Sequence, residues 1–72
     1  MIIIKIGKRI RDLRETRGIP LGCMAESLNL SVSHLLSIER NTRRATSNEI
    51  ADICRVLGVK RYELYADTID YF

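Results

Sequence analysis

Apolar residues recur at helical spacing near the start of the chain. Ile6, Ile10 and Leu13 fall at positions i, i+4 and i+7, with charged residues on the other faces. This spacing predicts a helix over about residues 5–17. Gly18 is expected to end that helix, because glycine readily takes the left-handed conformation of a helix cap.

A shorter second helix is predicted directly afterwards. Pro20 suits its first turn, because proline lacks an N–H group that would otherwise stay unpaired there. The helix should span about two turns. Its buried stripe is expected at Leu21, Met24, Ala25 and Leu28.

A tight turn and a third helix follow. Asn29 and Leu30 break the apolar pattern, and asparagine tolerates the left-handed conformation that such a turn needs. Ser31 can cap the free N–H groups of the next helix, which is predicted over about residues 32–40.

Two more helices complete the predicted set. The pattern Thr46-x-x-Glu49 matches a capping box, and Gly58 is expected to close the helix that starts there. A short fifth helix is predicted over about residues 60–67, although Lys60 is a poor residue to start one. The isoleucine run at residues 2–4 fits an edge strand or an extension of the first helix equally well, because periodicity does not separate the two.

The bulk composition is that of one soluble domain. Hydrophobic residues make up 46% of the 72 residues and charged residues 29%, which argues against a disordered or membrane-spanning chain. We therefore expect a single all-α domain over residues 1–72. The apolar start, Met1 to Ile4, is too short for a signal peptide, so a cytoplasmic location is expected.

The chemistry-bearing residues are few. Cys23 and Cys54 fit no zinc or redox spacing, so both are expected to be buried, reduced thiols, and neither a metal nor a cofactor is predicted. A chain with one histidine has little room for a nucleophile with its base or for a metal cluster. We expect a protein that is not an enzyme.

The charge is unevenly distributed along the chain. Residues 1–44 hold nine Lys and Arg against four Asp and Glu, whereas residues 45–72 hold three against five. A one-sided basic field is typical of a protein that binds a polyanion. Two short helices joined by a tight turn within the basic part, about residues 20–40, match the helix-turn-helix unit, whose second helix enters the DNA major groove.

Four segments carry a resemblance to a known family. They are Ile6-Gly7-Lys8-Arg9-Ile10-Arg11-Asp12-Leu13-Arg14, Met24-Ala25-Glu26-Ser27-Leu28, Ser37-Ile38-Glu39-Arg40-Asn41 and Leu57-Gly58-Val59. With these, roughly residues 6–65 resemble the Cro/C1 phage-repressor family (XRE-type regulators). The resemblance implies a compact five-helix, lambda-repressor-like domain. It also implies that the helix after Ser31 reads double-stranded DNA in a sequence-specific, usually dimeric, transcription regulator.

The resemblance places base-reading residues on that third helix. Val32, Ser33 and Ser37 occupy the positions concerned, with Ser31 and His34 beside them. Serine hydroxyls discriminate poorly between bases, whereas valine can pack on a thymine methyl group. His34 is expected either to donate to a base or phosphate or to be merely exposed. Because direct readout is modest, specificity should need two half-sites and therefore a homodimer.

The resemblance also implies phosphate contacts just after the recognition helix. The residues concerned are Arg40, Asn41, Arg43 and Arg44, for which a merely solvated basic loop is the alternative. Arg14 and Glu39 match positions that the family joins in a partly buried structural ion pair.

The chain departs from the family pattern at three positions. Leu21 stands where a phosphate-binding glutamine is usual, Leu36 where the family is generally polar, and Asn41 where glycine is common. A second interpretation follows, in which the scaffold binds another protein, as in an antitoxin or phage adaptor. Leu21, Leu36 and the N-terminal isoleucines would then form the contact patch.

The aromatic residues cluster at the C-terminal end. All four fall within the last eleven residues, and residues 60–72 are therefore predicted to form a dimer interface. The alternative is a disordered tail from which only the first two tyrosines pack within the chain. The predicted interface residues are Tyr62, Tyr65, Ile69, Tyr71 and Phe72. Within the regulator class, both restriction-modification controller proteins and phage Cro-type repressors fit.

Overall fold

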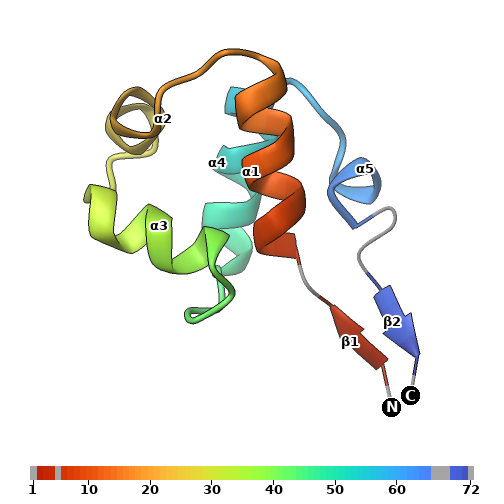
Figure 1. Cartoon of the computed structure of the whole chain (residues 1–72). Helices are drawn as coiled ribbons and strands as arrows, with labels where there is room; N and C mark the ends of the chain where they lie inside the picture. The colour runs from red at the N-terminus through yellow and green to blue at the C-terminus, as the bar shows by residue number, and fades with distance from the viewer. Residues whose placement is uncertain (1, 5, 66–68, 72) are drawn as a thin grey trace.

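The computed structural model describes the backbone of residues 2–4, 6–65 and 69–71 and the side chains of residues 6–65. Five helices form the body of the molecule, as predicted, and the two ends of the chain add one short strand each (Figure 1). The elements are β1 (Ile2–Ile4), α1 (Ile6–Thr16), α2 (Leu21–Ser27), α3 (Val32–Glu39), α4 (Ser47–Leu57), α5 (Arg61–Tyr65) and β2 (Ile69–Tyr71).

The helix ends follow from local chemistry. Gly18, Asn29 and Gly58, each predicted to take the left-handed conformation, have φ angles of 67°, 56° and 69°. The Ser31 hydroxyl accepts the His34 backbone N–H at 3.1 Å and so caps α3, as predicted. Pro20 differs slightly from its prediction, because it precedes α2 in an extended conformation instead of forming the first turn.

The predicted capping box of α4 is present in both directions. Glu49 N–H donates to the Thr46 hydroxyl at 3.1 Å, and Thr46 N–H donates to the Glu49 carboxylate at 2.8 Å. Lys60 also lies before its helix, and its N–H donates to the Glu63 carboxylate at 3.2 Å. Helix α5 is therefore shorter at its start than predicted, and residues 66–68 lie outside the described residues.

One apolar core joins all five helices. The fully buried large side chains include at least one from each helix, so no helix is an appendage. Burying such a side chain stabilises the fold by about 1.5–3 kcal/mol. These residues are Ile10, Met24, Leu35, Ile38, Ile53 and Leu64.

The two cysteines have different environments. Cys54 is buried, and this burial raises the pKa of its thiol. Cys23 is exposed, so the prediction of a buried thiol was wrong for this residue. The reason is its place on α2, which turns Met24 and Ala25 inward and therefore turns the preceding residue outward.

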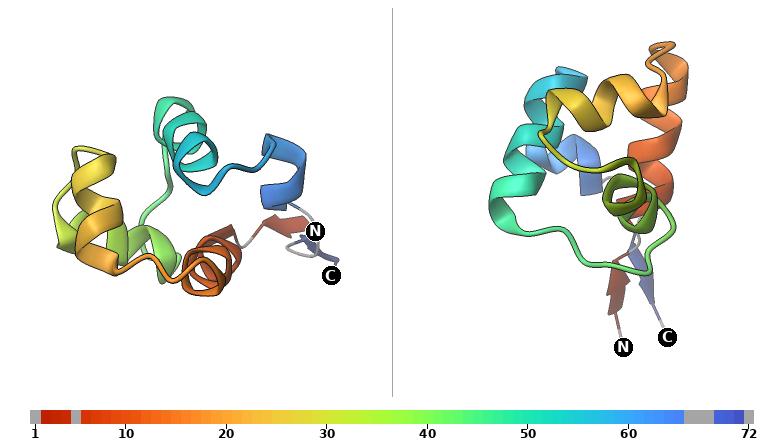
Figure 2. Two further views of the ribbon diagram at one scale, coloured as in Figure 1. Left: turned by 90° about the horizontal axis from the view of Figure 1, so that it is seen from above. Right: turned by 90° about the vertical axis from the view of Figure 1, so that its left-hand side faces the viewer.

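The ends of the chain pair in a two-stranded antiparallel sheet. Ile2, Ile3 and Ile4 lie opposite Tyr71, Asp70 and Ile69 respectively. Figures 1 and 2 show this sheet projecting from the helical body, with the two termini side by side. The isoleucine run is therefore a strand and not an extension of α1, in keeping with the preference of β-branched residues for strands. No helix of the described chain is long and apolar enough to cross a membrane.

Candidate nucleic-acid interface

Helices α2 and α3 form a compact two-helix unit. The connection between them turns sharply at Asn29, and Leu30 N–H donates to the Ala25 carbonyl at 2.9 Å. Figure 2 shows α2 lengthwise and α3 end-on in the same view, so the two helices cross steeply. This is the arrangement of a helix-turn-helix unit, in which the first helix braces the second.

Helix α3 has one buried and one outward face. Leu35, Ile38 and Glu39 are buried, and they set the inward side of the helix. The remaining positions at helical spacing therefore turn outward, which leaves Val32 46% exposed at the start of the helix. The outward face consists of Val32, Ser33, Leu36, Ser37 and Arg40.

The three serines predicted to contact DNA differ in what their hydroxyls can still do. The Ser37 hydroxyl donates to the Ser33 carbonyl at 2.9 Å, so it is left with acceptor capacity toward a ligand. The Ser31 hydroxyl accepts the cap hydrogen bond from His34 and retains its own hydrogen as a donor. The Ser33 hydroxyl makes no hydrogen bond to another described residue, so it can donate and accept.

His34 is not the merely exposed residue that one of its two expectations described. Its Nε2 lies 2.9 Å from a carboxylate oxygen of Glu49, and the side chains are only 22% and 17% exposed. The Nε2 atom is therefore engaged by Glu49 within the chain, and the expected contact with a base or phosphate stays a prediction. The sequence predicted Glu49 as part of the capping box of α4. It did not predict the contact between the second carboxylate oxygen of Glu49 and His34 on α3.

The loop after α3 is folded tightly around one carbonyl group. The Ser37 carbonyl accepts the Thr42 N–H at 3.0 Å, the Arg43 N–H at 3.3 Å and the Thr42 hydroxyl at 3.1 Å. This arrangement gives the loop a defined shape, to which Thr42 contributes although it was not among the predicted residues. The side chains of Arg40, Arg43 and Arg44 are exposed and form no hydrogen bond or ion pair with another described residue.

Asn41 serves mainly to join the loop to α1. Its φ is 61°, and its side-chain oxygen accepts the Gly7 N–H at 3.0 Å. A Cβ atom at Gly7 would collide with this oxygen and with the carbonyl oxygens of Ile38 and Glu39. Only the amide hydrogens of Asn41 remain to contact a phosphate. The glycine inside a predicted helix was the sequence signal for this close approach.

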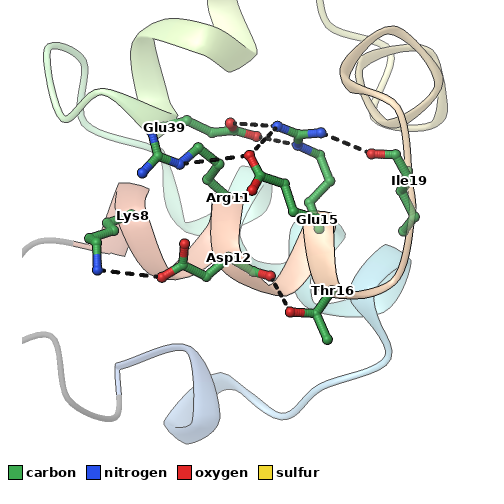
Figure 3. A network of polar contacts seen from close by, with 8 residues as sticks. Lys8, Arg11, Asp12, Glu15, Thr16, Ile19 and Glu39 are labelled. Carbon is green, nitrogen blue, oxygen red and sulfur yellow. Dashed lines mark hydrogen bonds and ion pairs between the residues drawn. The ribbon is translucent and has the colours of Figure 1, made fainter.

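The expected ion pair between Arg14 and Glu39 is present beneath α3. Arg14 Nε and Nη2 donate to the two Glu39 carboxylate oxygens at 2.8 and 3.2 Å. Figure 3 shows the two contacts that reach the labelled Glu39. Arg14 Nη1 also donates to the Ile19 carbonyl at 2.9 Å. The hydrogen bond to Glu39 raises the pKa of Arg14, although partial burial opposes this. The pair joins α1, the turn before α2 and the end of α3.

The predicted dimer residues lie in different environments. Tyr62 is 69% exposed on α5, whereas Tyr65 is half-buried against the core. Ile69 and Tyr71 lie in β2, whose side chains are outside the described part of the structure, and Phe72 lies outside the described residues altogether. Tyr62 is thus the exposed member of this set among the side chains that the structure describes.

The patch suggested for a protein partner includes two residues whose side chains the structure describes. Leu21 packs against the core, and Leu36 is half-buried on the outward face of α3. Residues 2–4 form the terminal strand, and nothing is described of their side chains.

Comparison with known proteins gives a consistent family. Residues 5–65 match the family model of the helix-turn-helix domain. The chain is similar to the HTH-type transcriptional regulator RamB of Mycobacterium tuberculosis, with 37% identity over 54 residues, which cover 75% of this chain and 11% of RamB. The chain therefore spans about a tenth of the length of this curated relative.

Solved structures of regulators have the same fold. The restriction-modification controller protein C.AhdI from Aeromonas hydrophila superposes with a TM-score of 0.80 and 27% identity, over 86% of this chain and 94% of that chain. The biofilm master regulator SinR, solved in complex with DNA, superposes with a TM-score of 0.75 and 33% identity, over 82% of this chain and 95% of that chain. For the N-terminal DNA-binding domain of SinR from Bacillus subtilis the TM-score is 0.72 and the identity 35%, over 82% of this chain and 87% of that chain.

Proposed function

The chain belongs to the helix-turn-helix domain family, as a regulator of the Cro/C1 (XRE) type, and from this premise we propose that it binds double-stranded DNA sequence-specifically as a small dimeric transcription regulator. In this proposal α3 lies in the major groove, which is wide enough to admit one helix. The exposed loop after α3 lies along the phosphate backbone.

One observation carries the proposal. Arg40, Arg43 and Arg44 are exposed beside the outward face of α3 and have no partner within the described structure, while the loop that holds them is fixed at the Ser37 carbonyl. Exposed cations on a backbone of defined shape, next to an outward-facing helix, suit phosphates on both sides of a groove. The solved complex of SinR with DNA, at 33% identity, is consistent with this use of the fold.

Base recognition is assigned to the outward face of α3. Val32 is exposed enough to pack on a thymine methyl group, and Ser33 can donate to or accept from a base edge. Ser37 retains only acceptor capacity, which suits the amino group of adenine or cytosine. Such contacts discriminate weakly, so two half-sites and a homodimer are needed for specificity.

The dimer is proposed to form through the C-terminal region. Tyr62 is the most exposed large hydrophobic residue of the described chain, and tyrosine is enriched at protein interfaces. The termini lie together on one side of the body, so an interface there leaves α3 free (Figure 1). The likeness to C.AhdI over nearly the whole of that chain supports a compact regulator of the controller or Cro class.

Selection of bound duplexes from a random pool tests the proposal directly. A consensus with two related half-sites is expected, and affinity for it should fall log-linearly with salt. Ser33→Ala combined with Ser37→Ala should blur this consensus while leaving non-specific binding nearly intact. Recovery of no enriched sequence, together with salt-insensitive or absent DNA binding, would contradict the proposal.

A second candidate function is binding of a protein partner through α3. Val32 and Leu36 lie one turn apart on its outward face, which gives that face an apolar side. SinR, which resembles this chain at 33% identity, has been solved in a complex with the SinI protein. Association through an apolar surface should change little with salt, so the same titration separates the two functions.

A further inference from the structure

The contact between His34 and Glu49 joins the first turn of α3 to the first turn of α4. Glu49 uses one carboxylate oxygen to accept the Thr46 N–H at 2.8 Å and the other to contact His34 Nε2 at 2.9 Å. The backbone N–H of His34 is itself held by the Ser31 hydroxyl at 3.1 Å. The caps of both helices are therefore linked through a single histidine–carboxylate contact.

We infer that His34 and Glu49 form a latch that positions the DNA-reading start of α3 against α4 and makes specific DNA affinity depend on pH near neutrality. The inference rests on the proposed DNA-binding function. His34 is a positioning residue in this account, because Glu49 holds its side chain, whereas Val32 and Ser33 beside it face outward.

The charge state of histidine decides the strength of such a latch. Histidine is the side chain that ordinarily gains or loses its charge between about pH 5 and 8. A protonated imidazole and a carboxylate form a charge-assisted hydrogen bond, which is stronger than the bond made by a neutral ring. His34 is the one histidine of the chain.

Among the side chains of residues 6–65, Glu49 is the charged group within ion-pair distance of His34. The charges of α1 pair along that helix, with Glu39 or with a backbone carbonyl, and Glu26 on α2 is exposed. The other charged groups of α1, α3 and α4 have partners of their own: Arg14 with Glu39, Asp52 with Arg55, Lys8 with Asp12, Arg11 with Glu15, and Arg9 with the Glu63 carbonyl. The loop arginines Arg40, Arg43 and Arg44 are exposed.

Glu49→Gln is the informative variant. The glutamine side-chain oxygen can still accept the Thr46 N–H and keep the capping box. The substitution removes the negative charge that faces His34. Asp52→Asn is the matched control, because it removes the same charge one turn later from a residue that is paired with Arg55. His34→Gln removes the imidazole itself.

The test measures affinity for the selected duplex and for a scrambled duplex between about pH 5.5 and 8. Wild type and Asp52→Asn should bind the selected duplex about threefold to fivefold more tightly at the acid end, while the scrambled duplex changes much less. Glu49→Gln and His34→Gln should lose this preference. A pH profile unchanged in Glu49→Gln, or equal on both duplexes, would show that His34 acts as a simple surface charge and would overturn the latch.

A measurement without DNA keeps the latch separate from the proposed function. Amide protection factors of His34 and Leu35 report opening of the first turn of α3 in the free protein. They should fall several-fold in Glu49→Gln and stay unchanged in Asp52→Asn. Unchanged protection in both variants would reject the latch even if the protein binds DNA, whereas absent DNA binding with the expected loss of protection would reject the function alone.

Discussion

The backbone N–H of Gly7 on α1 donates to the side-chain oxygen of Asn41, just after α3, at 3.0 Å. This contact brings the start of the first helix against the end of the recognition helix. Asn41 reaches it from a left-handed backbone conformation, with a φ of 61°. The loop that carries Arg43 and Arg44 is therefore attached to α1 at its start.

Gly7→Ala should destabilise the protein although alanine is the better helix former. The added Cβ would collide with the carbonyl oxygens of Ile38 and Glu39, and separating α1 from α3 should cost about 1–3 kcal/mol of unfolding free energy. Gly22→Ala on α2 is the control, because nothing lies near its Cβ position, and it should gain up to about 1 kcal/mol. Urea denaturation measures both, and a neutral Gly7→Ala would refute the close approach.

Removing one partner of the buried ion pair should be costly. Glu39→Ala leaves Arg14, whose side chain is 11% exposed, without its carboxylate, and the unfolding free energy should fall by about 3 kcal/mol. Asp12→Ala breaks only the exposed contact with Lys8 and should change the unfolding free energy by no more than about 0.5 kcal/mol. Thermal and urea unfolding compare the two variants. Equal, small losses would mean that the pair adds nothing to stability.

The double change Arg43→Ala with Arg44→Ala should weaken binding to every duplex. Both side chains are exposed and unpaired within the described structure, so the fold should persist. The slope of log affinity against log salt should become shallower by about 2, since about two phosphate contacts are lost. Lys8→Ala with Arg55→Ala removes the same charge from exposed positions on α1 and α4 as a control. An unaltered slope in the first variant would show that the loop does not clamp phosphates.

Val32 is expected to sense thymine methyl groups. Replacing thymine by uracil in the selected half-site removes one methyl group, and losing that contact should weaken wild-type binding up to about fourfold. Val32→Ala should bind the two duplexes alike, whereas Ser33→Ala should keep the difference. Fluorescence anisotropy with each duplex provides the comparison. A thymine preference that survives in Val32→Ala would assign the readout to another residue.

Tyr62 should contribute to self-association without contributing to the fold. Its side chain is 69% exposed, so Tyr62→Ala should leave thermal stability of the monomer nearly unchanged. A buried aromatic residue at an interface is often worth 2 kcal/mol or more, so the dimer dissociation constant should rise at least about tenfold. Sedimentation equilibrium measures this constant, with Arg55→Ala on α4, outside the predicted interface, as the control. A dimer equally stable in both variants would place the interface elsewhere.

Much of the helical framework followed from interactions between residues close in the sequence. The hydroxyl cap of Ser31, the capping box of Thr46 with Glu49 and the left-handed turns at Asn29 and Gly58 were all predicted, and all are present. Each involves groups within a few residues of one another, so composition and spacing are enough to specify it.

Tertiary structure decided the contacts between residues far apart in the sequence. The link from His34 to Glu49, the hydrogen bond from Gly7 to Asn41 and the pairing of β1 with β2 join segments whose proximity depends on how the whole core packs. The apolar pattern specifies which face of a helix is buried, but several helix arrangements can satisfy it, and each would bring different polar groups together. Here the core brings Glu49 against α3 and leaves Arg43 and Arg44 exposed beside it, because side-chain packing among all five helices fixes their relative positions.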